Sequence, residues 1–167
     1  TTAALVYVLH HITRMLEDNA YVRCLFIDYS RAFDTINHDL LIRKLISLEL
    51  PSFVVRWVAN FLTGRTQAVS SDGKLSSWLP ITQSIVQGSS IGPMLYIIFA
   101  SDLKLLSATN FLCKYADDKT LMVPENTNIS LEDEFRHIMQ WSAQNKLTLN
   151  FTITKEMFFH RPGPCRF

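Results

Sequence analysis

Residues 110–123, NFLCKYADDKTLMV, carry the sharpest structural signal in the chain. Apolar runs stand on either side of the adjacent acids Asp117 and Asp118, a pattern that predicts strand, tight turn and strand with both acids at the turn. Two like charges side by side repel each other, so this placement indicates a cation nearby, and Mg²⁺ prefers carboxylate oxygens. A solvated turn is the plain alternative, because Asp is a common turn residue.

A second acidic position follows another apolar run. Residues 23–29 predict a short strand that is central in its sheet, because the run is almost wholly apolar up to Asp28. If this strand and the hairpin are neighbours, Asp28, Asp117 and Asp118 converge at one edge of the sheet. Three convergent acids can hold two Mg²⁺ ions, an arrangement that serves phosphoryl and nucleotidyl transfer.

The composition is that of one domain, or a large piece of one. The chain has 167 residues, of which 48% are hydrophobic and 19% charged, so it can bury a core. A net charge of +1 is weak for a nucleic-acid binder, so either the ligand is not nucleic acid or the basic surfaces lie elsewhere. The chain starts at Thr1 without an initiator Met, and we expect a fragment of a longer polypeptide. Its three cysteines form no metal or disulfide pattern, which fits a reducing compartment, and no apolar run is long enough to span a bilayer.

Apolar periodicity and capping residues predict the order of the elements. We expect helices over 1–18, 37–48, 52–62 and 130–145, and a helix from Pro93 whose apolar face extends to Leu106. We expect strands over 23–29, 147–151 and 156–160, and hairpins over 65–80, around Asp72-Gly73, and over 110–123. This order predicts an α+β fold in which a mostly antiparallel sheet has helices packed on one face.

Four blocks of the sequence resemble one family of enzymes. They are residues 26–38 (FIDYSRAFDTINH), 87–96 (QGSSIGPMLY), 115–118 (YADD) and 147–157 (LTLNFTITKEM). Taken together, they resemble the catalytic motifs of reverse transcriptases from non-LTR (LINE-type) retrotransposons. The blocks stand in the order of that family and cover most of the chain.

The resemblance implies a right-hand polymerase palm with a ferredoxin-like core and some of the fingers. Residues 1–167 would form this palm-centred fragment, without the N-terminal fingers blocks and the C-terminal thumb. The implied activity is RNA-directed DNA polymerisation, with two Mg²⁺ ions (Mn²⁺ as a substitute), dNTPs, an RNA template and a DNA primer. The rest of the retrotransposon polyprotein, with its endonuclease and thumb, would be its partner. We expect no membrane association and, for the parent element, a location in nucleus and cytoplasm.

The resemblance also assigns roles to single residues. Asp28, Asp117 and Asp118 would bind the metal ions, joined by the backbone carbonyl of Tyr29. Lys155 would protonate or neutralise the leaving pyrophosphate. The nucleotide would be held by backbone N–H groups of Arg31 and Ala32, by Phe33 as a steric gate against a ribose 2′-OH, by Gln87, and by Gly88, which allows close backbone approach.

Each of these roles has a plainer alternative. Phe33 could belong to the core, Gln87 and Gly88 could form an ordinary turn, and Lys155 could be a solvated lysine on an edge strand. Asp34 has no catalytic role in this interpretation, because it can cap the following helix.

The sequence departs from the family pattern at three positions. Ser84 and Val86 replace the glycine and proline of Gly-hydrophobic-Pro-Gln-Gly, and Ile153 stands where a lysine is common. These departures favour the alternative of an inactive, truncated copy that folds as a palm and at most binds metal or RNA weakly. A group II intron-type or telomerase-type polymerase with the same mechanism is a further alternative.

Overall fold

A four-stranded antiparallel sheet forms the centre of the first of two compact units in the computed structural model. This unit comprises Thr1–Ser30 and Leu103–Phe167, and the second unit comprises Arg31–Asp102. The structure describes residues 2–86 and 88–161.

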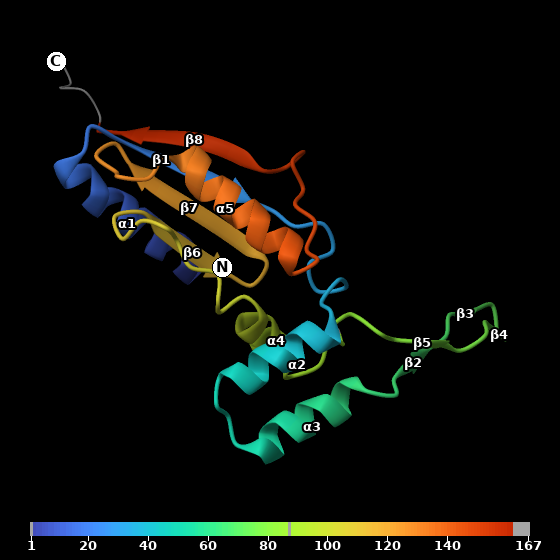
Figure 1. The fold of residues 1–167 in the computed structure, drawn as a ribbon. Coiled ribbons are helices and arrows are strands. Elements are labelled where there is room, and N and C mark those ends of the chain that lie inside the picture. Colours follow the sequence, from blue (N-terminus) through green and yellow to red (C-terminus); the bar gives the residue numbers. More distant parts are fainter. Residues whose placement is uncertain (1, 87, 162–167) are drawn as a thin grey trace. The chain divides into compact units, whose positions relative to one another are not determined.

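The strands of the sheet come from distant parts of the chain. They are β1 (Tyr21–Ile27), β6 (Phe111–Tyr115), β7 (Asp118–Pro124) and β8 (Lys155–His160). Their spatial order is β6-β7-β1-β8, and every neighbouring pair is antiparallel (Figure 1). The expected α+β fold with an antiparallel sheet is therefore confirmed, and β1 has the predicted central position.

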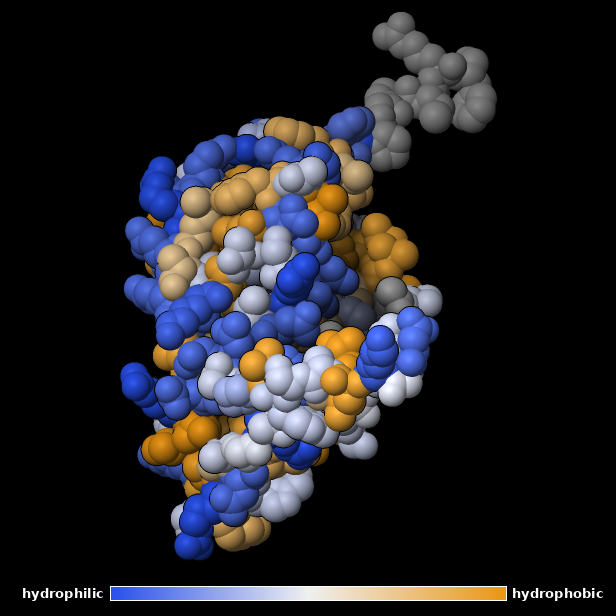
Figure 2. Space-filling model, turned by 90° about the vertical axis from the view of Figure 1, so that its right-hand side faces the viewer, coloured by the Kyte–Doolittle hydropathy of each residue, from blue (hydrophilic) through white to orange (hydrophobic). Residues whose placement is uncertain are grey.

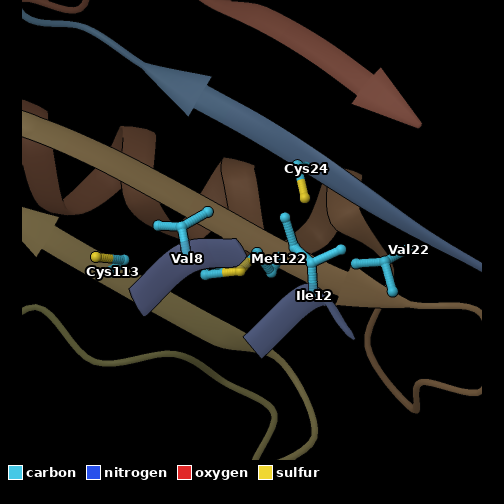
Figure 3. Close-up of a cluster of buried hydrophobic side chains, with 6 residues drawn as sticks. All are labelled: Val8, Ile12, Val22, Cys24, Cys113 and Met122. Atoms are coloured by element: carbon cyan, nitrogen blue, oxygen red, sulfur yellow. The ribbon is translucent and has the colours of Figure 1, made fainter. Parts of the chain in front are cut away.

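Helices cover both faces of this sheet. α1 (Thr2–Asp18) packs on one face through Val8 and Ile12, and α5 (Leu131–Gln144) lies on the other face (Figure 3). The shared core under α1 consists of Val8, Ile12, Val22, Cys24, Cys113 and Met122. The expectation of helices on one face only is wrong, because both alternating sets of β1 side chains carry apolar residues that are buried.

The second unit is built from helices and one extended hairpin arm. Its helices are α2 (His38–Ser47), α3 (Ser52–Leu62) and α4 (Gly92–Phe99). The arm pairs β2 (Thr66–Gln67) with β5 (Leu79–Pro80) and β3 (Ser70–Ser71) with β4 (Lys74–Leu75). Asp72 and Gly73 form the tip with positive φ angles, as the sequence predicts.

Two expected elements are shorter or absent. α4 ends at Phe99, and the Lys44 ammonium donates a hydrogen bond to the Phe99 carbonyl at 2.7 Å. Leu106 therefore lies beyond the helix and is not part of its apolar face. Residues 147–151 form no strand; they make only an isolated bridge between Leu149 and Tyr29. The side chain of Asn150 instead accepts a hydrogen bond from the N–H of Thr152, which turns the chain before β8.

The surface mixes polar and apolar residues. Figure 2 shows hydrophilic and hydrophobic residues interspersed over one face. Among the described residues, no helix has both the length and the apolar character needed to cross a bilayer.

Candidate active site

Asp117 and Asp118 lie at the tip of the hairpin formed by β6 and β7. Asp117 occupies the two-residue turn with Ala116, whose φ is 52°, and Asp118 is the first residue of β7, paired with Tyr115. The sequence placed both acids in the turn; the structure places one in the turn and one on the strand. The difference matters because a strand residue has its direction fixed by the pairing register.

The register of the sheet brings Asp28 to this hairpin. Ile27 of β1 pairs with Lys119 of β7, so one further step along both strands sets Asp28 beside Asp118. The pKa of the Asp118 carboxyl is raised, first by partial burial and then by repulsion from Asp117 and Asp28; Lys119 opposes the shift. Asp117 and Asp28 are therefore close enough to Asp118 to raise the pKa of its carboxyl.

These carboxylates are neighbours but are not drawn together around a common point. Within residues 2–86 and 88–161, no three His, Cys, Asp or Glu side chains form a cluster arranged to hold a metal ion. Their chemistry still suits a hard divalent cation, since all three donors are carboxylates and their mutual repulsion would be relieved by positive charge.

The backbone around Asp28 is held by the segment that precedes β8. The Asp28 carbonyl accepts the N–H of Asn150 at 2.9 Å, and the N–H of Ser30 donates to Thr148 at 2.8 Å. This antiparallel bridge leaves the carbonyl of Tyr29 outside its two hydrogen bonds. The Tyr29 side chain is buried on the α5 side, where its hydroxyl lies 2.9 Å from Ser142 Oγ. Burial raises the pKa of Tyr29 to about 12, and the hydrogen bond with Ser142 lowers it in part.

Lys119 is a residue of this region that sequence analysis missed. Its side chain is only 1% exposed, and its Nζ lies 4.1 Å from the centre of the Tyr29 ring. Burial and then repulsion from Lys114 lower the pKa of Lys119 to about 7, against the attraction of Asp117 and Asp118. The sequence of β7 could have predicted this burial. Alternate residues of a strand share a face, and position 119 shares its face with the buried Leu121 and Val123.

A cavity opens beside two of the acids. It measures about 380 Å³ and is lined by Asp28, Asp118, Lys119, Thr120 and Ile153 together with mostly apolar residues of α1, β1 and β6. Ile153 is the position where the family pattern favours lysine. Lys155 is exposed at the start of β8 and pairs with Phe26, so it points to the same face of the sheet as Asp28.

The expected nucleotide-binding residues belong to the second unit. Arg31 has a positive φ of 51°, and its carbonyl accepts the N–H groups of Asp34 and Thr35 in the turn before α2. Ala32 is buried. Phe33 is half-buried and stacks on Tyr96 with ring centres 4.6 Å apart.

Phe33 and Gly88 line one cavity of about 340 Å³ in this unit. Gly88 has a φ of 79°, which a side chain would oppose. The structure thus brings these two predicted residues together, while Gln87 lies outside the described residues.

The backbone at Ser84 explains why the family pattern has glycine at this position. This residue has a φ of 97°, in the region that favours glycine. The departure from glycine that the sequence shows therefore places a side chain on a strained backbone.

Comparisons with known proteins were made against families, curated proteins and solved structures. Residues 5–166 match the family model described as reverse transcriptase (RNA-dependent DNA polymerase). The RNA-directed DNA polymerase from mobile element jockey of Drosophila melanogaster is 29% identical over 95% of this chain and 18% of its own length. A probable RNA-directed DNA polymerase from transposon BS of the same species is 32% identical over 70% of the chain and 14% of its own length. The chain thus spans less than a fifth of the curated relatives it matches.

Among solved structures, apo telomerase from Candida tropicalis truncated from its C-terminal domain superposes with a TM-score of 0.73. That match covers 98% of this chain and 36% of the telomerase chain at 14% sequence identity. A second telomerase structure, with a fragment of telomeric RNA, gives a TM-score of 0.71 at the same identity. At this identity the likeness shows a shared fold.

Proposed function

Because the chain belongs to the reverse transcriptase family, we propose that it supplies the palm-centred core of an RNA-directed DNA polymerase of a non-LTR retrotransposon. The observation that carries the proposal is the register of β1 and β7, which sets Asp28 beside Asp118 with Asp117 in the adjoining turn. If the acids served only in a solvated turn or as helix caps, there would be no reason for acids from two distant strands to lie next to each other. The proposed substrates are dNTPs, with an RNA template and a DNA primer.

The strand connections support the assignment of a palm. The chain runs from β1 through the helical unit to the β6–β7 hairpin, then through α5 to β8, and the strand order is β6-β7-β1-β8. This is the β-α-β-β-α-β connection of ferredoxin-like folds. We assign residues 1–167 to the palm with part of the fingers. The remaining fingers, the thumb and the endonuclease would come from the rest of a longer polyprotein acting in nucleus and cytoplasm.

Asp28, Asp117 and Asp118 would hold the divalent cations, for which Mg²⁺ is the proposed species and Mn²⁺ a substitute. Bound ions would activate the attacking primer hydroxyl and stabilise charge on the leaving pyrophosphate. The protein contributes the placement of the ligands. The bridge between Tyr29 and Leu149 fixes the backbone at Asp28, and its geometry leaves the Tyr29 carbonyl available as a further oxygen ligand.

The second unit would hold the nucleotide. The turn after Arg31 uses the N–H groups of Asp34 and Thr35 for its own bonds, so those of Arg31 and Ala32 are the proposed contacts of the triphosphate. Phe33 would exclude a ribose 2′-OH by the bulk of its ring, which Tyr96 supports from behind. Gly88 and Gln87 would complete this side of the nucleotide site.

Two positions are candidates for a lysine that neutralises the leaving pyrophosphate, Lys155 and the position occupied by Ile153. Lys155 faces the same side of the sheet as Asp28, whereas Ile153 lines the cavity that contains Asp28 and Asp118. We propose Lys155 as the group that neutralises the leaving pyrophosphate in this chain.

Primer extension tests the proposal. We would place the chain within its full-length reading frame and measure dTTP incorporation on a poly-rA/oligo-dT template with Mg²⁺. Asp28→Asn and Asp117→Asn should each lower incorporation about 100-fold or more, because each removes a charged metal ligand without changing its shape. Asp72→Asn is the matched control, since Asp72 lies at the tip of the hairpin arm with a φ of 49° that Asn tolerates.

One observation favours the second candidate function, an inactive copy. Ser84 has a positive φ shortly before Gln87 and Gly88, the proposed nucleotide-binding residues, and glycine is the residue that this conformation favours. A folded full-length protein that binds RNA but extends no primer would establish this alternative. Extension that survives both aspartate substitutions would place the chemistry elsewhere.

A further inference from the structure

Ser89 lies shortly before the start of α4 and carries a buried hydroxyl. Its Oγ is shielded from solvent and has no hydrogen-bond partner among the residues that the structure describes. Leaving a buried donor and acceptor unpaired is unfavourable, and native proteins do it rarely. Such a group at a cavity indicates a partner that comes from outside the chain.

Ser89 lies in the wall of the cavity that contains Phe33. The cavity of about 340 Å³ is lined by Phe33, Ile85, Val86, Gly88, Ser89, Gly92 and Pro93. Ser89 contributes the one polar side chain in this described lining, and none of the lining side chains is charged. The site therefore suits a small, uncharged, mostly apolar group that carries a hydroxyl.

The backbone fixes this cavity from both sides. The N–H of Ile85 donates to the Phe33 carbonyl at 2.9 Å, which ties the Phe33 turn to the segment before Gly88. On the other side, the N–H of Ser89 donates to the Val86 carbonyl at 3.1 Å. A Cβ on Gly92 would lie only 3.0 Å from Ser89 Oγ, so glycine at position 92 keeps the space that the serine side chain occupies.

We infer that Ser89 hydrogen-bonds the 3′-hydroxyl of the incoming deoxynucleotide. The inference rests on the proposed function, under which Phe33 faces the sugar. A deoxyribose presents ring carbons that match the apolar wall, and it carries one free hydroxyl that matches one serine. Serine both donates and accepts, and its single χ1 rotation turns the hydroxyl toward a bound sugar. The triphosphate finds no charged side chain in this lining, which leaves the sugar as the occupant.

The test compares dTTP with dideoxy-TTP, which lacks the 3′-hydroxyl. In the full-length protein we would measure kcat/KM for a single incorporation of each nucleotide on poly-rA/oligo-dT. Ser89→Ala should lower kcat/KM for dTTP about 3- to 10-fold and leave that for dideoxy-TTP unchanged, because only dTTP loses a hydrogen bond. Ser90→Ala, at the exposed neighbouring serine, should change neither value.

Equal losses for both nucleotides in Ser89→Ala would overturn the inference, because they would reveal a structural role. An unchanged kcat/KM for dTTP would overturn it as well. If the wild-type protein extends no primer, the proposed function fails separately. Equilibrium binding of the two nucleotides then decides the inference, since a wild-type protein that binds dTTP no more tightly than dideoxy-TTP contradicts it.

Discussion

At the scale of the single residue, Ser84 holds a backbone conformation that its side chain opposes. Its φ of 97° lies where glycine has no steric penalty. Ser84→Gly should raise the free energy of unfolding by about 1 kcal/mol, because relief of strain exceeds the extra backbone entropy of glycine in the unfolded chain. Urea denaturation measures the change.

The matched control for Ser84 is Ser90→Gly. Ser90 has no positive φ, so the same substitution there relieves no strain and should lower the free energy of unfolding. Equal effects of the two glycines would mean that the backbone at Ser84 is not strained.

Cys24 allows a second prediction at this scale. The residue is fully buried, and burial raises the pKa of its thiol to about 12 from 9.0. A raised pKa keeps the thiol neutral, so very little of the reactive thiolate forms in the folded protein at neutral pH. Iodoacetamide at pH 8 should leave Cys24 unmodified in the folded protein and alkylate it in urea, as read by mass spectrometry. Rapid labelling of Cys24 without denaturant would show that the α1 face of the sheet opens.

At the scale of the element, Glu134 joins α5 to the segment that leads into β6. Its carboxylate is fully buried and accepts the N–H groups of Leu106 and Ser107 and the side-chain amide of Asn110. Glu134→Ala should lower the free energy of unfolding by about 3 kcal/mol, because three donors, two of them in buried hydrogen bonds, lose this acceptor.

Glu132 provides a control on the same helix. It is more than half exposed and pairs with Arg23 at 2.7 Å. Glu132→Ala should cost less than about 1 kcal/mol, as surface ion pairs do. If both variants lower the free energy of unfolding by similar amounts, the hydrogen bonds of Glu134 do not stabilise the segment before β6.

The segment that leads into β8 offers a test of the lysine position. Ile153 lines the cavity beside Asp28 and Asp118, so Ile153→Lys would bring an ammonium group to the acids and the leaving pyrophosphate. We expect primer extension to rise about tenfold, within the range of positioned acid catalysis. Ile153→Met is the control for side-chain length without charge. If Ile153→Lys lowers primer extension and Ile153→Met does not, the cavity excludes the added charge. That result would favour Lys155 as the lysine that neutralises the pyrophosphate.

At the scale of the whole molecule, the near-neutral charge limits binding to nucleic acid. With a net charge of +1, the 167-residue chain has little surplus positive charge for phosphates. We expect it to bind an RNA–DNA primer-template with a Kd of about 10 µM or weaker at physiological salt, in the non-specific range. Fluorescence anisotropy over a salt series measures this. Nanomolar binding by the 167-residue chain would mean that it contains a complete binding site for the primer-template.

Short-range sequence signals predicted most of the helices and tight turns of this protein. Apolar spacing predicted α1, α2, α3 and α5 to within a few residues, and Asn37 and Ser130 cap α2 and α5 as expected. The turn residues Asp72 and Gly73 likewise predicted the tip of the arm. These signals act within one or two helical turns or across a single tight turn, so the residues concerned are close in sequence and can be read together.

The tertiary structure alone decided which distant residues meet. The pairing of β1 with β7 places Asp28 beside Asp118, and tertiary packing leaves Glu134 and Lys119 buried. The residue pattern also does not reveal the positive φ of Ser84, or that the Ser89 hydroxyl has no hydrogen-bond partner within residues 2–86 and 88–161. Register and burial depend on contacts between segments that can be more than a hundred residues apart. Periodicity gives the face of each element, and only packing selects its partner.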